Sequence, residues 1–334
     1  MPKLRQISIA CQTNLLPSEY IEFAQVANRY DFDVVSVYSD LPYHPAYGPL
    51  VLMAPHLQRA RVGPAGVTPA RLAPIDMAAQ AALLHSCAPA GSYLGLVRGA
   101  WNEEFGIPPL PRPLTALPEC ARIVRQLWRG EAIDPVPQIF PVPKKARLAV
   151  PLPQAEIPIL VGTWGPKLAR RACDFAAEVK VGGSANPTLA AHMADILRAG
   201  ETHYQRNPSA VKLVLGCVTV VDQDHSQARA FARQCVARYL SVVYPLDATI
   251  DCDPEWFNRL LVCLQQDDLK RATELISDEI LDAFALAGRP GEIIHRCEEL
   301  YAAGVDRIEF GTPHGLSRNS GISLLGKEVL PSLQ

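Results

Sequence analysis

The chain has 334 residues, of which 49% are hydrophobic, enough for a large buried core. Its formal net charge of −2 gives no indication of a nucleic-acid-binding or anionic-membrane-binding surface. We find no signal peptide and no apolar run of the roughly 18 residues that a membrane span needs, so we expect a cytoplasmic protein. Its nine cysteines are scattered, without a CxxC or Cys/His cluster, which predicts reduced thiols and no structural zinc.

Strand-like apolar runs alternate with helix-length periodic segments almost from end to end. Several runs are continuously apolar, as in parallel strands that are covered on both faces. The expected strands are Arg5–Cys11, Asp33–Tyr38, Ala60–Ala65, Tyr93–Val97, Ile157–Val161, Ala177–Val181, Lys212–Val221 and Arg307–Phe310. The expected helices are Ser18–Tyr30, Pro49–Gln58, Pro74–Ser86, Leu114–Arg129, Pro166–Phe175, Pro187–Gln205, Gln223–Val243 and Pro290–Ala303.

Eight strands with interleaved helices predict an α/β fold of the (β/α)8 TIM-barrel type. A dinucleotide-binding fold is disfavoured because no GxGxxG follows the first strand. Two segments are additional to the repeating strand–helix pattern. One is a proline-rich insertion after the fourth strand, about residues 131–156, and the other is a set of two or three short helices at about 251–287. We predict a single domain over residues 1–334.

The active site of a (β/α)8 enzyme lies at the carboxyl ends of its strands. Asp40 directly follows the second strand, where its carboxylate could accept a hydrogen bond from a ring N–H or a hydroxyl of a ligand. The alternative is an Asp that caps a turn before Pro42. At the end of the fourth strand, Arg98 suits a phosphate or carboxylate, or else a salt bridge inside the protein. Trp101 could stack on a flat ring or simply pack there.

The run from Ile157 to Gly183 reads as strand, glycine turn, helix and strand. Its turn opens a helix with Pro166, where backbone N–H groups and the helix dipole favour an anion. The alternative is an ordinary turn with a surface lysine. His314, after the eighth strand, is a candidate proton donor or ligand contact, although a lone histidine in such a loop is more often just exposed. No histidine pair has metal-ligand spacing and no GxSxG motif is present, so we expect neither a metal site nor covalent catalysis.

Six motifs in order resemble the bacterial luciferase-like superfamily. Within it, the chain is most similar to the deazaflavin-dependent branch that includes methylenetetrahydromethanopterin reductase. The resemblance covers nearly the whole length, and the tail SLLGKEVLPSL (323–333) is similar to the end of that branch. The motifs are SVYSDLPY (36–43), GPAGVTPARLAP (63–74), YLGLVRGAW (93–101), PILVGTWGPKLARRA (158–172), AAEVKVGGSANP (176–187) and AGRPGEIIHRCEELYAAGVDRIEFGTPHG (287–315).

The resemblance implies a TIM barrel with an insertion after the fourth strand and a flat tricyclic cofactor across the strand ends. The cofactor is coenzyme F420, a 5-deazaflavin, or alternatively FMN. A non-proline cis peptide is implied between Gly66 and Val67, behind the ring. Arg170 and Arg171 are expected to help attract an anionic tail. The implied cofactor-binding residues are Ser39, Asp40, Gly66, Val67, Thr68, Arg98, Gly99, Trp101, Gly162, Thr163, Trp164, Gly165, Pro166, Lys167, Gly182 and Gly183.

Two departures from the family pattern concern the chemistry. Leu41 stands where deazaflavin enzymes of this family usually have histidine, and Ala10-Cys11-Gln12 stands where the reductase branch has a glutamate in its first strand. Gln12 or His314 could substitute for the missing acid. Otherwise the substrate differs, or the fold is retained without this reaction.

We therefore expect an oxidoreductase that exchanges hydride between F420 and a small organic substrate, with methylenetetrahydromethanopterin or a related pterin or folate as candidates. Asp40, Gln12 and His314 are the candidate catalytic residues. An FMN-dependent monooxygenase and a non-catalytic cofactor-binding protein are the alternatives. We also expect a homodimer or a higher homo-oligomer.

Overall fold

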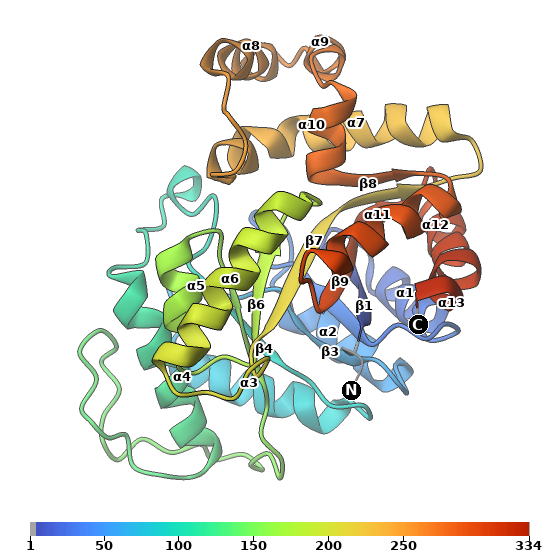
Figure 1. Cartoon of the computed structure of the whole chain (residues 1–334). Helices are drawn as coiled ribbons and strands as arrows, with labels where there is room; N and C mark the ends of the chain where they lie inside the picture. The colour runs from blue at the N-terminus through green and yellow to red at the C-terminus, as the bar shows by residue number, and fades with distance from the viewer. Residues whose placement is uncertain (1–4, 334) are drawn as a thin grey trace. The chain divides into compact units, whose positions relative to one another are not determined.

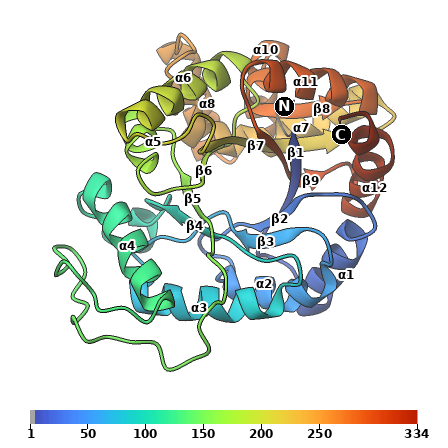
Figure 2. The ribbon, with the colours of Figure 1, turned by 60° about the horizontal axis from the view of Figure 1, so that its bottom comes forward.

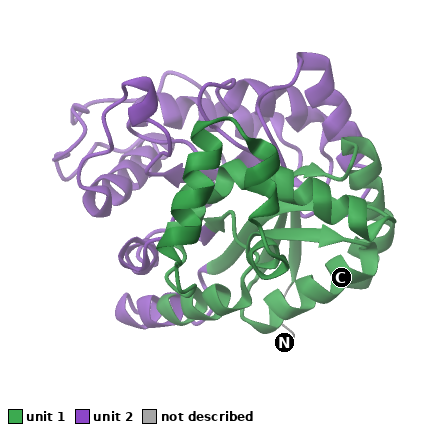
Figure 3. Ribbon diagram, turned by 90° about the horizontal axis from the view of Figure 1, so that it is seen from above, with its two compact units in different colours: residues 1–9, 181–196, 212–334 green, residues 10–180, 197–211 purple. Residues whose placement is uncertain are grey.

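The computed structural model describes residues 5–333, in which helices and strands alternate along the chain (Figure 1). The chain divides into two compact units (Figure 3). Unit 1 comprises Met1–Ile9, Val181–Ile196 and Lys212–Gln334, and unit 2 comprises Ala10–Lys180 and Leu197–Val211. All nine cysteines are free thiols. Within residues 5–333, no helix is long and apolar enough to cross a membrane.

Unit 2 is built around parallel strands. The strands that belong to it wholly or in part are β1 (Gln6–Cys11), β2 (Val34–Val37), β3 (Arg61–Pro64), β4 (Leu94–Val97), β5 (Ile159–Gly162) and β6 (Glu178–Gly182). Strand β2 pairs with β3, and β5 lies between β4 and β6. Isolated bridges at Val62–Ser92 and Val67–Leu96 join the β3 and β4 segments. All these pairs are parallel, so the carboxyl ends of the paired strands lie on the same edge.

The helices of unit 2 follow its strands, and most of them begin at a proline. They are α1 (Pro17–Ala27), α2 (Tyr47–Met53), α3 (Pro74–Cys87), α4 (Pro113–Trp128) and α5 (Pro166–Ala172). Proline suits the first helical position because its φ is already helical and its missing N–H would have no partner there. Helices α3 and α4 lie side by side (Figure 2). Their apolar faces are buried, as the periodic sequence pattern predicts.

A buried cluster in unit 2 forms near the start of β2, β4 and β5. Tyr93 packs with Val34 and Leu160 in one buried cluster, and its hydroxyl donates to Ser36 Oγ at 2.8 Å. Glycine at position 63 makes room for this ring, because a Cβ there would lie 2.6 Å from a ring carbon of Tyr93. These residues therefore form part of the buried core of unit 2.

The proline-rich segment 131–156 has no helix or strand and runs as a long loop near α3 and α4 (Figure 2). Glu119, a buried residue of α4, holds it in place. The Glu119 carboxylate accepts hydrogen bonds from the backbone N–H groups of Gln138, Ile139 and Phe140 at 2.6, 2.7 and 3.1 Å. One charged side chain thus satisfies three consecutive donors that extended backbone leaves unpaired.

Unit 1 contains the last three strands of the chain, β7 to β9. Strand β9 (Arg307–His314) lies between β1 and β7 (Lys212–Val221), with Gln6 opposite Arg307 and Val214 also opposite Arg307. The last strand therefore pairs with the first. The second half of β7 pairs with β8 (Ala285–Gly288), a short strand that the sequence pattern did not predict.

The helices of unit 1 include three in the segment 251–287. Helix α6 (Pro187–His203) begins in unit 1 and ends in unit 2. The unit 1 helices that follow are α7 (His225–Val243), α8 (Pro254–Gln265), α9 (Leu269–Glu274), α10 (Asp278–Phe284), α11 (Pro290–Ala302), α12 (Arg318–Leu324) and α13 (Leu330–Leu333). A π-helical turn, Leu325–Val329, joins the last two.

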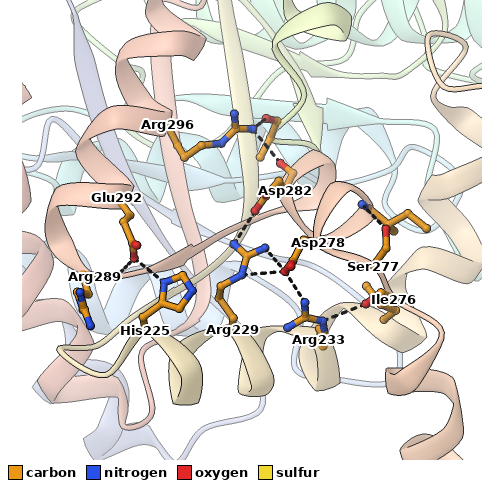
Figure 4. A network of polar contacts seen from close by, with 12 residues as sticks. His225, Arg229, Arg233, Ile276, Ser277, Asp278, Asp282, Arg289, Glu292 and Arg296 are labelled. Atoms are coloured by element: carbon orange, nitrogen blue, oxygen red, sulfur yellow. Dashed lines mark hydrogen bonds and ion pairs between the residues drawn. The ribbon is translucent and has the colours of Figure 1, made fainter.

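A network of ion pairs fastens α10 to α7 (Figure 4). Arg229 donates to Asp282 Oδ1 at 2.7 Å and, through two of its nitrogens, to Asp278 Oδ1. Arg233 donates to the same Asp278 oxygen and to the backbone carbonyl of Ile276. The arginines are mostly buried, and their guanidinium groups connect two helices that are about 50 residues apart in the sequence.

Candidate functional site

Asp40 lies just beyond β2, after Tyr38 and Ser39. It is half-buried and is held by Gln12, which directly follows β1. Gln12 Nε2 donates to Asp40 Oδ2 at 3.1 Å, and Gln12 Oε1 accepts from the backbone N–H of Thr13 at 2.8 Å. The second bond fixes which way the Gln12 amide points, so its NH2 group faces the carboxylate. The structure thus brings together two of the three predicted catalytic residues.

Two cations that were not among the predicted site residues act on Asp40. Burial raises the pKa of Asp40, while the Gln12 hydrogen bond and the charges of Arg71 and Lys180 oppose that rise. Arg71 donates to the backbone carbonyl of Ser39 at 2.5 Å. Lys180 is a buried residue of β6, and its Nζ lies 5.3 Å from the centre of the Tyr38 ring. A lysine inside the apolar strand EVKVG was the available signal, because a buried lysine needs a counter-charge.

The non-proline cis peptide lies between Ala65 and Gly66, so its predicted position between Gly66 and Val67 is wrong by one residue. The backbone of Val67 is already in register with the β4 segment. Its N–H donates to Gly95 O at 2.8 Å, and its carbonyl accepts from Val97 N at 3.0 Å. The N–H of Ala65 still donates to Val37 O, so the chain changes partner at Gly66. A Cβ at Gly66 would lie 2.6 Å from Gly95 O, which only glycine avoids.

Thr68 is buried, and its hydroxyl forms two hydrogen bonds with the protein backbone. Its hydroxyl donates to the backbone carbonyl of Arg98 at 2.7 Å and accepts from the N–H of Ala70 at 3.2 Å. The side chain therefore ties the segment after β3 to the end of β4. Its predicted contact with a cofactor remains a prediction, and its observed role is to fix the backbone of Arg98.

The segment after β4 has a constrained backbone. Gly99 has φ +96°, and a Cβ there would lie 2.5 Å from Asn102 Nδ2, so glycine is required. Trp101, half-buried, also has a positive φ, +56°. Asn102 is buried, and its Oδ1 accepts no hydrogen bond from the described residues. The Arg98 side chain is exposed and forms no ion pair within residues 5–333, which leaves it available to an anion.

The turn after β5 combines close packing with exposed cations. A Cβ at Gly162 would lie 2.7 Å from Val97 Cγ1, so this glycine allows β5 to pack against β4. The N–H of Gly165 donates to Thr163 Oγ1 at 2.9 Å. Lys167 and Arg170 are exposed, whereas Arg171 is paired with Asp174 at 2.5 Å and also donates to Tyr204. The expectation that Arg171 attracts an anionic tail is weakened, because its charge is already balanced.

Three predicted site residues belong to unit 1, and the contacts described for them lie within that unit. Gly183 has φ +90° and donates its N–H to Gly216 O at 2.5 Å, and a Cβ there would lie 2.2 Å from a ring carbon of Tyr239. At the neighbouring Gly182, a Cβ would meet no atom within 4 Å. His314 is buried rather than exposed, because β9 continues beyond Phe310 to pair His314 with Val220.

Within residues 5–333 no cluster of His, Cys, Asp and Glu could hold a metal ion. The groups gathered at Asp40 are its own carboxylate, the cations Arg71 and Lys180, and the carboxamide of Gln12. Such a set can hold a polar ring by hydrogen bonds and can bind or release a proton at Asp40.

The chain is similar to known proteins over almost its full length. A 5,10-methylenetetrahydromethanopterin reductase of Archaeoglobus fulgidus is 25% identical over 322 residues, which is 93% of this chain and 95% of the relative.

Two solved structures have the same fold. The coenzyme F420 dependent tetrahydromethanopterin reductase of Methanopyrus kandleri matches with a TM-score of 0.90 at 21% identity, over 99% of this chain and all of the other. An F420-dependent secondary alcohol dehydrogenase in complex with an F420-acetone adduct matches with a TM-score of 0.81 at 18% identity, over 99% of both chains. The match confirms the predicted (β/α)8 barrel. The family model described as luciferase-like monooxygenase matches residues 9–307, and the chain therefore belongs to this family.

Proposed function

We propose that the protein is an oxidoreductase that transfers hydride between coenzyme F420 and a small organic substrate. The observation that carries the proposal is the Asp40 carboxylate at the end of β2, oriented by Gln12 and acted on by Arg71 and Lys180. The F420-dependent structures and the reductase relative, similar over nearly the whole chain, support the choice of cofactor.

The groups present fit a deazaflavin. Its ring carries an imide N–H between two carbonyls, and a carboxylate beside cationic donors complements that pattern. Asn102 Oδ1 is a buried acceptor without a partner among the described residues. Buried polar atoms of this kind are uncommon and favour a ligand that satisfies them. Exposed Lys167 and Arg170 suit an anionic tail.

When bound, F420 supplies the hydride, which it exchanges at C5 of its ring. The contribution of the protein is to position the two reactants and to exclude water. Gln12 fixes the orientation of Asp40, whose raised pKa lets Oδ1 or Oδ2 hold a proton at a higher pH than an ordinary carboxyl. Asp40 is therefore the proposed proton donor in a site where Leu41 cannot carry one and the first strand lacks a glutamate.

Fluorescence titration of the purified protein with F420 and with FMN tests the proposal. We expect F420 to bind with a dissociation constant below about 100 µM, FMN to bind much more weakly, and Asp40→Ala to weaken F420 binding or turnover while the fold is kept. A yellow protein that retains FMN would support the alternative, an FMN-dependent monooxygenase, which the name of the family favours. If neither cofactor binds at about 100 µM, both proposals fail and a non-catalytic role gains support.

The finer features remain proposals. Methylenetetrahydromethanopterin or a related pterin or folate is a candidate substrate, because a relative bears the name of that reductase. Stopped-flow oxidation of reduced F420 by candidate substrates would identify the acceptor. A homodimer and a cytoplasmic location also stay predictions. Sedimentation equilibrium would test the first and cell fractionation the second.

A further inference from the structure

A cavity of about 350 Å³ lies in unit 2, between the segment that leads from β3 into α3 and the proline-rich segment after α4. Its walls are Pro69–Ile75 on one side and Phe140–Pro143 on the other. Among these lining residues Arg71 is the only one with a charged or polar side chain. Small-molecule pockets typically have this composition, with apolar walls and few polar groups that set the orientation of the ligand.

The walls are held in a fixed shape. The Glu119 carboxylate accepts the N–H groups of Gln138, Ile139 and Phe140, which positions the outer wall from inside α4. The N–H of Val142 then donates to Phe140 O at 2.7 Å. Two prolines on each side restrict φ at four of the lining positions. A preformed cavity loses little conformational freedom when a ligand enters it.

Arg71 connects the cavity with the end of β2. One of its five N–H donors goes to the carbonyl of Ser39, and its half-buried guanidinium makes no other hydrogen bond with the described residues. Its Nε is buried without a partner. Asp40 acts on Arg71 electrostatically, but burial still lowers the pKa of Arg71, so the nearby carboxylate does not fully compensate for desolvation. An anion bound from the cavity side would accept from the guanidinium N–H groups that make no hydrogen bond with the described residues.

We propose that this cavity binds an apolar group carrying one carboxylate, with the carboxylate on Arg71. At about 30 Å³ for each non-hydrogen atom, the volume holds on the order of ten such atoms, the size of a short alkyl or aryl carboxylate. A pterin ring has several donors and acceptors, which these apolar walls would leave unpaired. If the proposed function holds, the cavity takes the part of the substrate remote from the reacting carbon, because Arg71 contacts the residue that precedes Asp40.

Calorimetric titration with hexanoate and with its neutral counterpart hexanamide tests the proposal without any cofactor. We expect hexanoate to bind about tenfold or more tightly than hexanamide, as a charge-assisted hydrogen bond requires. Arg71→Met should remove that difference, and Arg71→Lys should keep part of it. Absence of hexanoate binding at about 10 mM, or equal binding of both compounds, would overturn the proposal.

Substitutions in the outer wall give a test that does not depend on Arg71. Val142→Trp fills the cavity and should reduce hexanoate binding at least tenfold, whereas Val150→Trp, in the same segment at a position 45% exposed and outside the cavity, should leave it unchanged. Unchanged hexanoate binding in Val142→Trp would overturn the proposal.

F420 titration separates this proposal from the proposed function. If saturating hexanoate weakens F420 binding more than about twofold, the cavity belongs to the cofactor and the proposal is wrong. If F420 fails to bind while hexanoate binds and Val142→Trp abolishes that binding, the pocket stands and the proposed function fails.

Discussion

Substitution by alanine should destabilise the protein at Gly183 but not at Gly182, the last residue of β6. At Gly183 the new Cβ would lie 2.2 Å from a ring carbon of Tyr239, whereas ordinary carbon contacts are about 3.5–4.0 Å. Such overpacking costs about 1–3 kcal/mol. The φ of +90° adds a penalty of about 1–2 kcal/mol for a residue with a side chain. At Gly182 the Cβ would meet nothing within 4 Å, so the fold should tolerate it.

The expected destabilisation by Gly183→Ala is therefore about 2–5 kcal/mol. With an unfolding entropy of about 2.1 cal/mol/K per residue, 334 residues give about 0.7 kcal/mol/K. The melting temperature should fall by about 3–7 °C, as measured by differential scanning calorimetry. Gly182→Ala should melt within about 1 °C of wild type but, as a proposed cofactor contact, should weaken F420 binding.

Two results would refute this reasoning. One is equal melting temperatures for Gly183→Ala and wild type, because the ring of Tyr239 would then have moved aside without cost. The other is a Gly182→Ala variant as unstable as Gly183→Ala. Gly183→Ala combined with Tyr239→Ala supplies the control, since removal of the ring should leave only the backbone part of the penalty.

Three further predictions concern buried or bridging charges. Glu119→Gln should destabilise the protein by about 1.5–3 kcal/mol, because the new amide NH2 must face one of the three backbone N–H donors. Hydrogen exchange at residues 138–140 should become faster, and unchanged exchange would contradict this prediction. Because the folded-state pKa of Asp40 is raised, its ionisation destabilises the folded protein as the pH rises above the ordinary carboxyl range. Asp40→Asn should therefore melt above wild type at about pH 7 and converge with it near pH 4, and a lower melting temperature at about pH 7 would exclude the assigned direction. Arg229→Met should lower the melting temperature by only about 1–2 °C, because its partners Asp278 and Asp282 are 65% and 40% exposed. A much larger drop would mean that the network in Figure 4 stabilises the protein more than a surface ion pair does.

The fold was largely predictable because parallel barrel strands are continuously apolar and their helices are amphipathic. The strand Lys212–Val221 matches its predicted bounds, and most other predicted elements differ only at their ends. Strand β8 escaped prediction because ALAG has weak intrinsic strand preference, so its conformation depends on pairing with β7. The extension of β9 to His314 likewise depends on pairing with β7, across a register shift that no local pattern encodes.

The site was less predictable than the fold because its important contacts are non-local. The sequence placed Asp40 and Gln12 at strand ends, but only the structure shows that one donates to the other. Arg71 and Lys180 lay inside quoted motifs without being singled out, since their effect on Asp40 depends on three-dimensional proximity. Gly183 was read as a cofactor contact, although its positive φ and the ring of Tyr239 already account for a glycine there.

The way in which the chain passes between the two units limits how evolution or engineering can exchange its parts. The chain changes unit after residues 9, 180, 196 and 211. No contiguous stretch of the gene therefore encodes one whole unit without part of the other. Recombination at a single crossover would divide at least one unit between two parents. In chimaeras, the residues on both sides of the unit boundary in β1 and in β6 should come from the same parent, because each of these strands spans a change of unit. Residues 10–180, which contain Gln12, Asp40, Arg71 and Lys180, can nevertheless be inherited together as one segment.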